Sequence, residues 1–239
     1  MSGGTVAADF EDAYVLHSRP YQETSQILEV LGAQHGRLGL VARGARRPTS
    51  RWRSILQPFL PLRLSWVGRG SLLTLRGAEA ASFSPPLDGL AVMGAFYLNE
   101  LILNFVRRGD PHPGLFIAYS HALAELRAGG DSEPALRRFE LQLLAEAGYG
   151  LNLDHDVLND RPLDPAAVYE YRLEQGPMPA AIGGAALTFS GAELLAIGRG
   201  DFTVPACLPA AKRLLRSVLA HYLDGRALKT RAVLASMRR

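Results

Sequence analysis

The sequence predicts an α+β protein of two parts: a small closed barrel of five short strands, followed by a mainly helical domain. Three observations support this prediction. Apolar and polar residues alternate in the first third of the chain, and the apolar period becomes helical afterwards. The stretch SFSPPLDG, with two prolines and a glycine, separates the two patterns. We therefore expect one domain at residues 1–83 and a second at residues 84–239.

The predicted strands of the first domain are short and are separated by turn signals. They lie near residues 13–18, 25–31, 37–43, 60–66 and 71–76. In LPLRLSW the alternation is clean, with Leu62, Leu64 and Trp66 on one face of the strand. The OB-fold is a five-stranded barrel of this kind, and its exposed face and loops bind oligonucleotides. An SH3-like barrel or a small sandwich fits the same periodicity.

The second domain is predicted to be built from helices. These lie near residues 89–106, 114–127, 133–147, 190–198 and 209–223, with Gly148 as a stop signal for the third. The stretch around 150–190 is irregular and predicts loops with a short hairpin. The most apolar run, GLAVMGAFYLNELILNFV, is interrupted by Asn99 and Glu100, which favours a buried helix over a membrane span.

Composition limits the class of protein. The chain has 239 residues, of which 48% are hydrophobic and 21% charged, as in an ordinary globular protein. Cys207 is the single cysteine, so an internal disulfide and a cysteine-rich zinc site are excluded. The first residues, MSGGTVAADF, lack the pattern of a signal peptide. We therefore expect a cytoplasmic protein.

Positive charge is concentrated in one segment of the first domain. The formal net charge is only +3, but residues 36–59 hold six arginines and no acid. They are Arg37, Arg43, Arg46, Arg47, Arg51 and Arg53. Such a concentration indicates a polyanionic partner, because clustered like charges repel one another and a facing polyanion offsets this repulsion. A solvated loop, or a loop paired with acids of the helical domain, is the alternative.

A second basic face is predicted on the last helix. At 100° per residue, Lys212, Arg213 and Arg216 share one side of the helix, and leucine and valine residues share the other. The basic side either extends a binding surface or is an ordinary solvated face.

Several blocks of the sequence resemble a known family. VLHSRPYQETS, VARGAR, LRRFELQLLAEAGYG and YLDGRALKTRAVL occur in this order. In these blocks the chain is similar to the bacterial recombination and repair mediator family RecO. The resemblance implies an OB-type N-terminal domain, a helical domain and no enzymatic step. It also implies binding of single- and double-stranded DNA, annealing of complementary strands, and cooperation with RecR and the single-stranded-DNA-binding protein in loading RecA. A nucleoid-associated location in the cytoplasm follows from these roles.

The resemblance gives the arginine cluster a ligand. Arginines on and beside a barrel face would contact successive phosphates with little sequence preference. Between Arg51 and Arg53, Trp52 either stacks on a base or packs the loop onto the barrel.

The helical domain is expected to bind the acidic C-terminal tail of the single-stranded-DNA-binding protein. Leu136, Phe139 and Leu143 form an apolar stripe, and Arg137 and Arg138 emerge beside it. A tail with acids and a terminal aromatic residue requires an apolar cavity with a guanidinium at its rim. The alternative is that the stripe is core and that the arginines pair with acids such as Glu133 or Glu140.

The sequence departs from the family at one site. Many members carry four cysteines as a zinc site, whereas this chain has no CxxC motif, so we expect no zinc and no cofactor. LNLDHDVLND lies where the first ligands are expected. A carboxylate-bound ion at Asp154, Asp156 and Asp160, near His155, is the alternative to a solvated acidic loop.

Enzymatic motifs are absent from the sequence. It contains no GxxxxGK[ST], GxSxG or HExxH pattern, and its six histidines are scattered. An RNA-binding or ribosome-associated OB protein has the same electrostatics and is the remaining alternative.

Overall fold

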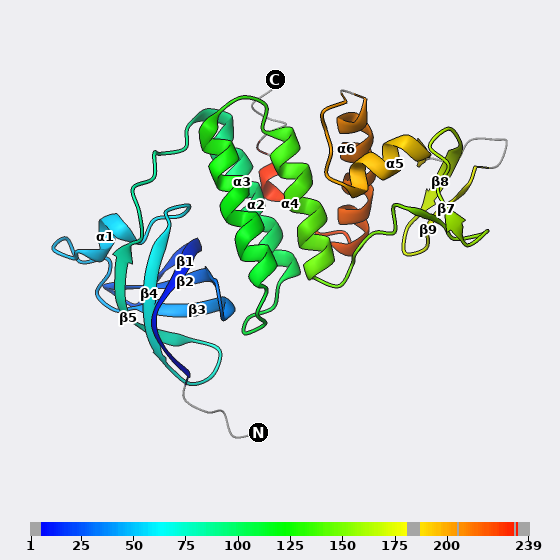
Figure 1. Cartoon of the computed structure of the whole chain (residues 1–239). Helices are drawn as coiled ribbons and strands as arrows, with labels where there is room; N and C mark the ends of the chain where they lie inside the picture. Colours follow the sequence, from blue (N-terminus) through cyan, green and yellow to red (C-terminus); the bar gives the residue numbers. More distant parts are fainter. Residues whose placement is uncertain (1–5, 181–186, 205, 232, 234–239) are drawn as a thin grey trace. The chain divides into compact units, whose positions relative to one another are not determined.

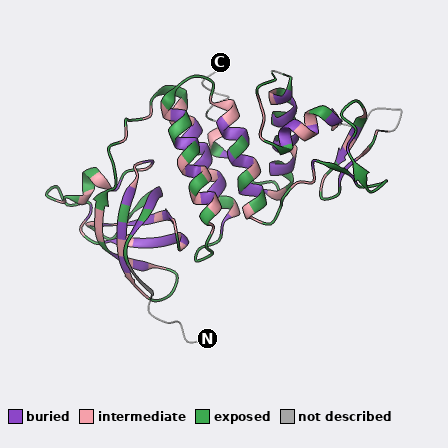
Figure 2. Ribbon diagram, viewed as in Figure 1, coloured by how far each residue is buried: buried purple, intermediate pink, exposed green. Residues whose placement is uncertain are grey.

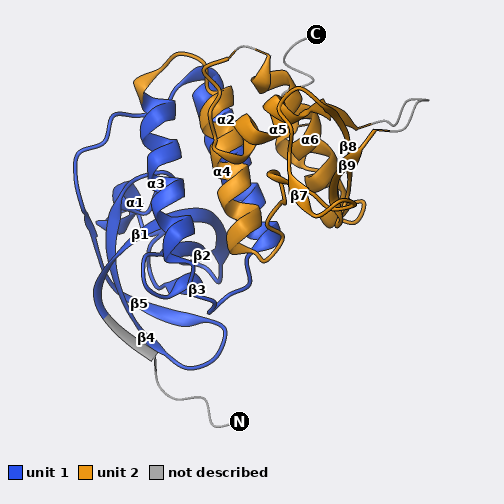
Figure 3. Cartoon of the chain, turned by 45° about the vertical axis from the view of Figure 1, so that its right-hand side comes forward, with its two compact units in different colours: residues 1–127 blue, residues 128–239 orange. Residues whose placement is uncertain are grey.

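The computed structural model describes residues 6–180, 187–204, 206–231 and 233 (Figure 1). The predicted irregular stretch therefore lies partly outside the described residues, at 181–186. The chain divides into two compact units, Met1–Arg127 and Ala128–Arg239 (Figure 3).

Five strands form the predicted barrel in the first unit. They are β1 (Val6–Tyr21), β2 (Ser25–Gly32), β3 (Gly36–Ala42), β4 (Leu62–Gly68) and β5 (Leu73–Ala80). Their order around the barrel is β1-β2-β3-β5-β4, and it closes because β1 pairs with both β2 and β4. β1 is longer than predicted, and irregularities in its register lie between Val15 and His17 and between Ala8 and Glu11. Such bulges bend a strand, and this one passes from one partner to the other. The barrel prediction is confirmed.

The barrel strands carry many buried residues (Figure 2), and their side chains form the barrel core. In β4 the side chains of Leu62, Leu64 and Trp66 are at most 1% exposed, whereas Arg63 between them is exposed. Fourteen buried residues from the strands and the loop after β3 form one hydrophobic cluster. Removal of this apolar area from water is the main driving force for barrel formation.

Two helices belong to the same unit as the barrel. α2 (Gly89–Phe105) and α3 (Pro113–Ala128) match the first two predicted helices. Asn99 of α2 is 2% exposed, donates a hydrogen bond from Nδ2 to the backbone oxygen of Leu16 (2.7 Å) and accepts one from the hydroxyl of Tyr119 (2.6 Å). Burial raises the pKa of Tyr119 above its ordinary value, so the phenol stays protonated as a donor. Asn99 therefore links strand and helices as a satisfied buried amide.

The division between the two compact units falls after α2 and α3, at residue 127. Arg127 donates hydrogen bonds to the backbone oxygens of Phe59 and Pro85, and Tyr14 of β1 lies within hydrogen-bonding distance of Ser120 of α3 (3.0 Å). The boundary between domains near residue 84 stays a prediction, since compactness alone groups the first two helices with the barrel.

The described residues of the second unit form helices and short strands. Its longer helices are α4 (Glu133–Glu146), α5 (Gly191–Gly198) and α6 (Cys207–Tyr222), close to the predicted ranges, and residues 229–231 and 233 are also helical. A two-stranded sheet of β6 (His155–Asp156) and β7 (Arg161–Pro162) accompanies a three-stranded sheet of β8 (Val168–Arg172), β9 (Gly176–Pro179) and β10 (Thr188–Ser190). Ser190 and Glu193 form a capping box that starts α5.

Candidate nucleic-acid interface

Five of the predicted arginines lie exposed on the loop that follows β3. They are Arg43, Arg46, Arg47, Arg51 and Arg53. Gly44 adopts a positive φ of 69°, and Ala45 is buried in the barrel core, so the loop turns while it remains attached to the barrel. In the described part of the chain none of the five forms an ion pair with an acid. Their charge is therefore available to an anionic ligand.

Trp52 anchors this loop. It begins the short helical turn α1 (Trp52–Ile55), and its side chain packs against the barrel core together with Ile55. The indole Nε1 is buried, without a hydrogen-bond partner among the described residues. Trp52 therefore packs the loop onto the barrel, which is the alternative to base stacking. Base stacking would require the indole to leave the barrel.

Arg37 lies apart from the loop arginines and has a structural environment. Its Nε donates to Glu29 (3.0 Å), and its Nη1 donates to the backbone oxygens of Leu103 (2.8 Å) and Val106 (2.9 Å) at the end of α2. A guanidinium suits this position because the last carbonyl groups of a helix lack partners and carry negative partial charge. Arg108 also pairs with Glu29. Inclusion of Arg37 in the DNA-binding set is not supported by these contacts.

Glu29 makes the stability of this unit depend on pH. Burial raises the pKa of its carboxyl, but hydrogen bonds from Arg108 and the charge of Arg37 outweigh burial, so the pKa of Glu29 lies below its ordinary value. A carboxyl group whose pKa is lower in the folded state stabilises the fold at pH values above its unfolded-state pKa. This contribution to stability is lost as the pH falls through the folded-state pKa. We expect Glu29→Gln to destabilise the protein at pH 7 and to reduce the loss of stability between about pH 5 and pH 3. Urea unfolding at several pH values measures this. An unchanged pH dependence would contradict it.

Two residues at the end of β1, beside the β1–β2 turn that contacts the arginine loop, were not selected from the sequence. Tyr21 is 37% exposed, and Arg19 is exposed beside it on β1. Register places them: Tyr21 pairs with Ser25, and Gln26 pairs with Ala42, the residue that precedes the loop. The backbone N–H of Arg46 donates to the oxygen of Thr24 (2.8 Å). The signal available in the sequence was the block VLHSRPYQETS, which pairs an aromatic residue with an arginine at a turn.

The basic face predicted on α6 is partly engaged within its own unit. Lys212 pairs with Glu133 (2.6 Å between Nζ and Oε1). Arg213 donates to the backbone oxygen of Thr188 (2.6 Å) and lies over the ring of Phe189, 4.5 Å from its centroid. Arg216 is exposed. The three residues share a face as predicted, but two of them have intramolecular partners.

The predicted apolar stripe of α4 is core. Leu136, Phe139 and Leu143 are 9%, 1% and 0% exposed, so they form no open groove. Arg137 is buried, pairs with Glu140 (2.8 Å) and lies 3.8 Å from Glu133. These contacts correct the expectation that the stripe itself is a peptide surface, because helix packing buried it. Arg138, by contrast, is exposed.

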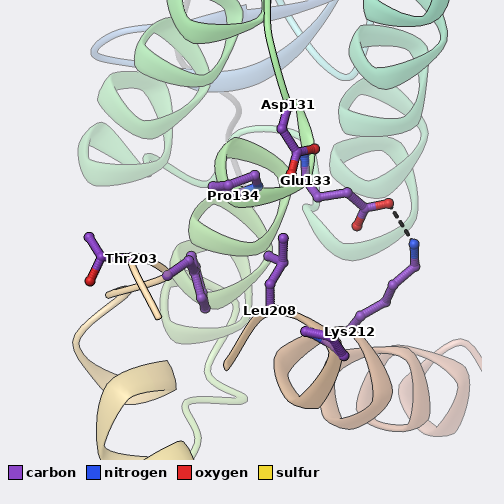
Figure 4. Close-up of a pocket in the computed structure, with 8 residues that line it drawn as sticks. Asp131, Glu133, Pro134, Thr203, Leu208 and Lys212 are labelled. Carbon is purple, nitrogen blue, oxygen red and sulfur yellow. Dashed lines mark hydrogen bonds and ion pairs between the residues drawn. The ribbon is translucent and has the colours of Figure 1, made fainter. Parts of the chain in front are cut away.

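An open cavity of about 460 Å³ lies next to this stripe, between the first turns of α4 and α6 (Figure 4). Pro134, Phe202, Leu208 and Pro209 give it apolar walls, and Asp131, Glu133, Thr203 and Lys212 complete its lining. Figure 4 shows Lys212 extended toward Glu133. The second carboxylate oxygen of Glu133 and the Nε of Arg137 are both buried without a hydrogen bond to the described residues. These two atoms lie 3.8 Å apart as an ion pair, and Arg137 itself does not line the cavity. The cavity thus combines apolar walls with the paired charges of Glu133 and Lys212.

The acidic loop near residue 155 does not gather ligands for a metal. Asp156 is fully buried and accepts hydrogen bonds from Asn159 (2.7 Å, side chain) and from the backbone N–H of Leu158 (3.0 Å). Asp154 pairs instead with His155. Across the described residues, no three His, Cys, Asp or Glu side chains are placed to share an ion.

Among the described residues, no helix combines the length and the apolar character needed to cross a bilayer.

Comparison with known proteins agrees with the two-part architecture. The family model for the recombination protein O N-terminal region matches residues 10–83, and that for its C-terminal region matches residues 86–232. The chain is 45% identical over 226 residues to the DNA repair protein RecO of Nitrosospira multiformis, covering 94% of this chain and 93% of the relative. It is 46% identical over 232 residues to the protein of that name from Nitrosococcus oceani, covering 96% and 94%. A closed OB-type barrel followed by a helical region, with both family models matched in order, shows that the chain belongs to the recombination protein O (RecO) family.

Proposed function

We propose that this protein is a DNA-binding recombination mediator without a catalytic step. It binds single- and double-stranded DNA, anneals complementary strands and, with RecR, helps to load RecA onto DNA covered by the single-stranded-DNA-binding protein. The observation that carries the proposal is the exposed, acid-free arginine loop beside the β1–β2 turn of an OB-type barrel. The names of the relatives, DNA repair protein RecO, support it.

The loop arginines supply affinity by replacing counterions on the phosphates. Each phosphate contact releases condensed cations, so binding is favourable at low salt and independent of base sequence. The same neutralisation promotes annealing, because two strands held against arginines repel each other less. The anchoring of the loop by Trp52 and Ala45 keeps these charges on one end of the barrel.

Tyr21 is the aromatic residue that we assign to base stacking at this surface. The Tyr21 side chain is exposed, whereas that of Trp52 packs against the barrel core. Stacking of a base on an aromatic ring contributes about 1–3 kcal/mol per base. We expect Tyr21→Ala to weaken binding of a short single strand by about tenfold and duplex binding by less than twofold, since duplex bases are already stacked. Tyr21→Phe is the matched control and should bind like the wild type. Equal losses on both substrates would contradict stacking.

The cavity between α4 and α6 is the proposed site for the tail of the single-stranded-DNA-binding protein. Its apolar walls suit a terminal aromatic side chain, and Lys212 suits a carboxylate. Lys212 is paired with the carboxylate of Glu133, which also lies near Arg137. A peptide carboxylate would replace the Glu133 carboxylate as the partner of Lys212. Arg137 is buried next to Glu133 and does not line the cavity itself.

Titration of a labelled acidic peptide that ends in phenylalanine tests this site. We expect Lys212→Ala to weaken binding by about tenfold, equal to about 1.4 kcal/mol, and Glu133→Gln to strengthen it by removing the competing carboxylate. Arg226→Ala, an exposed arginine away from the cavity, is the control. Arg137→Ala is less informative, because loss of the partner of buried Glu140 should cost about 3 kcal/mol of stability. Unchanged affinity in both the Lys212 and Glu133 variants would exclude this cavity.

An annealing assay tests the function as a whole. Complementary oligonucleotides are mixed without nucleotide, with and without the single-stranded-DNA-binding protein, and duplex formation is followed by fluorescence. Accelerated annealing in both conditions is expected. Absence of annealing, together with tighter binding to RNA than to matched DNA, would favour the alternative of an RNA-binding OB protein.

A further inference from the structure

The part of the arginine loop at residues 47–55 is held to the barrel at few points. It lies between Arg46, whose backbone N–H is bonded to the β1–β2 turn, and Leu56, which is 3% exposed in the barrel core. None of its residues is buried, and Trp52 and Ile55 are its members that pack against the core cluster. Its hydrogen bonds are local, because those formed within the described chain join residues at most four positions apart.

The helix α1 within this part of the loop does not sustain itself. It has four residues and no side-chain hydrogen bond at its N-cap, Arg51. Helix nucleation is unfavourable, so a single turn persists in water only where tertiary packing holds it. That packing is supplied by Trp52 and Ile55, the first and last residues of α1. Release of these two side chains therefore releases α1 from the barrel.

The packed position of Trp52 leaves its polar atom unsatisfied. The indole Nε1 is buried without a hydrogen-bond partner among the described residues, whereas in water it would donate a hydrogen bond. An unpaired buried donor costs free energy, which offsets part of the gain from burying the ring. The side chain as a whole is only partly buried. The packed and released positions of Trp52 are therefore closer in free energy than those of a fully buried apolar side chain.

The released position of Trp52 has a use when DNA is present. Arg51 and Arg53 are exposed on either side of Trp52 in the chain, and phosphates bound to them bring bases close to the indole. Every base has a π-face on which an aromatic ring can stack, but in a duplex these faces are already covered by neighbouring bases. Stacking on Trp52 is therefore available to single-stranded DNA and not to duplex DNA.

We propose that single-stranded DNA releases α1 from the barrel and that Trp52 then stacks on a base. Duplex DNA binds the loop arginines with Trp52 still packed. Trp52 thus selects single strands, through a rearrangement that the already exposed Tyr21 does not need. This inference rests on the proposed binding of DNA by the arginine loop.

The fluorescence of Trp52 tests the rearrangement directly. The chain contains two tryptophans, so Trp66→Phe leaves Trp52 as the single indole. Oligothymidylate should quench the Trp52 emission of this variant, because the ring stacks on a base, and a duplex should leave the emission nearly unchanged. Trp66 is 1% exposed in the barrel core. If its replacement unfolds the protein, fluorine NMR of the wild-type chain labelled with fluorotryptophan reports the same change, with the Trp52 signal assigned through Trp52→Phe.

The affinities of Trp52 and Ile55 variants test the energetics. Trp52→Leu keeps an apolar side chain for packing but has no ring, so it should bind oligothymidylate about tenfold more weakly, equal to about 1.4 kcal/mol, and duplex DNA with less than about a twofold change. The salt slope should not change, since no phosphate contact is lost. Trp52→Phe restores a ring and should recover most of the affinity. Ile55→Ala weakens only the packed state, so it should tighten single-strand binding by about threefold.

Three results would overturn the inference. They are a Trp52 emission that does not respond to single-stranded DNA, equal losses on both substrates in Trp52→Leu, and weaker single-strand binding in Ile55→Ala. If removal of the loop arginines abolishes DNA binding while the Trp52 emission never changes, the loop binds DNA and only this inference fails. If removal of the loop arginines leaves DNA affinity unchanged, the proposed DNA site fails and this inference with it. Unfolding temperatures near that of the wild type show that a lost affinity is not a lost fold.

Discussion

Replacement of Arg46, Arg47, Arg51 and Arg53 by alanine is expected to lower DNA affinity by about three orders of magnitude at 0.1 M salt. Each phosphate contact contributes about 0.7–0.9 to the slope of log affinity against log salt, so four contacts contribute about 3. The loss should be similar for unrelated DNA sequences, because phosphates carry no sequence information. Fluorescence anisotropy at several salt concentrations measures both quantities. The fold should survive, since all four side chains are exposed.

A second quadruple variant separates the position of the charge from its amount. Alanine at Arg107, Arg161, Arg172 and Arg226 removes the same formal charge from exposed sites elsewhere. We expect this variant to keep nearly all of the affinity and most of the salt slope. If the two quadruple variants lost affinity equally, overall charge would explain the binding. If the loop variant kept wild-type affinity and slope, the loop would not be the DNA site.

Gly36→Ala is expected to destabilise the first unit by about 4 kcal/mol. Gly36 has a positive φ of 65°, which costs an alanine about 1–2 kcal/mol, and its Cβ would overlap the backbone oxygen of Asp110. Overlap with backbone cannot be relieved by a side-chain rotation, so the segment between α2 and α3 must shift. That segment is bonded to the barrel, since the N–H of Gly109 donates to the oxygen of Arg37 (2.8 Å). Urea unfolding followed by circular dichroism measures the change.

Gly70→Ala is the matched control for the backbone conformation. Gly70 also has a positive φ, 80°, but nothing lies within 4 Å of a Cβ added there. It should cost only the conformational penalty of about 1–2 kcal/mol. Equal destabilisation by the two substitutions would mean that contact with Asp110 contributes nothing.

The candidate sites were only partly predictable from sequence. A run of arginines without acids predicts an exposed basic segment, and the five exposed arginines of the loop agree with this. The pattern could not distinguish Arg37, because its partners at Leu103 and Val106 are more than sixty residues away in the chain. Arg19 and Tyr21 were missed for the same reason, since strand register places them beside the loop.

By itself, the sequence determined the local structure of this protein. Alternation with period two defined the five strands and helical periodicity defined the long helices, because each pattern depends on neighbours a few residues apart. Only the tertiary structure decided which faces became core. It buried Phe139 and Arg137 of α4, turned Trp52 onto the barrel and grouped α2 and α3 with the barrel unit. An amphipathic face shows that a helix must bury one side, but the partner that covers it is chosen by packing between distant segments.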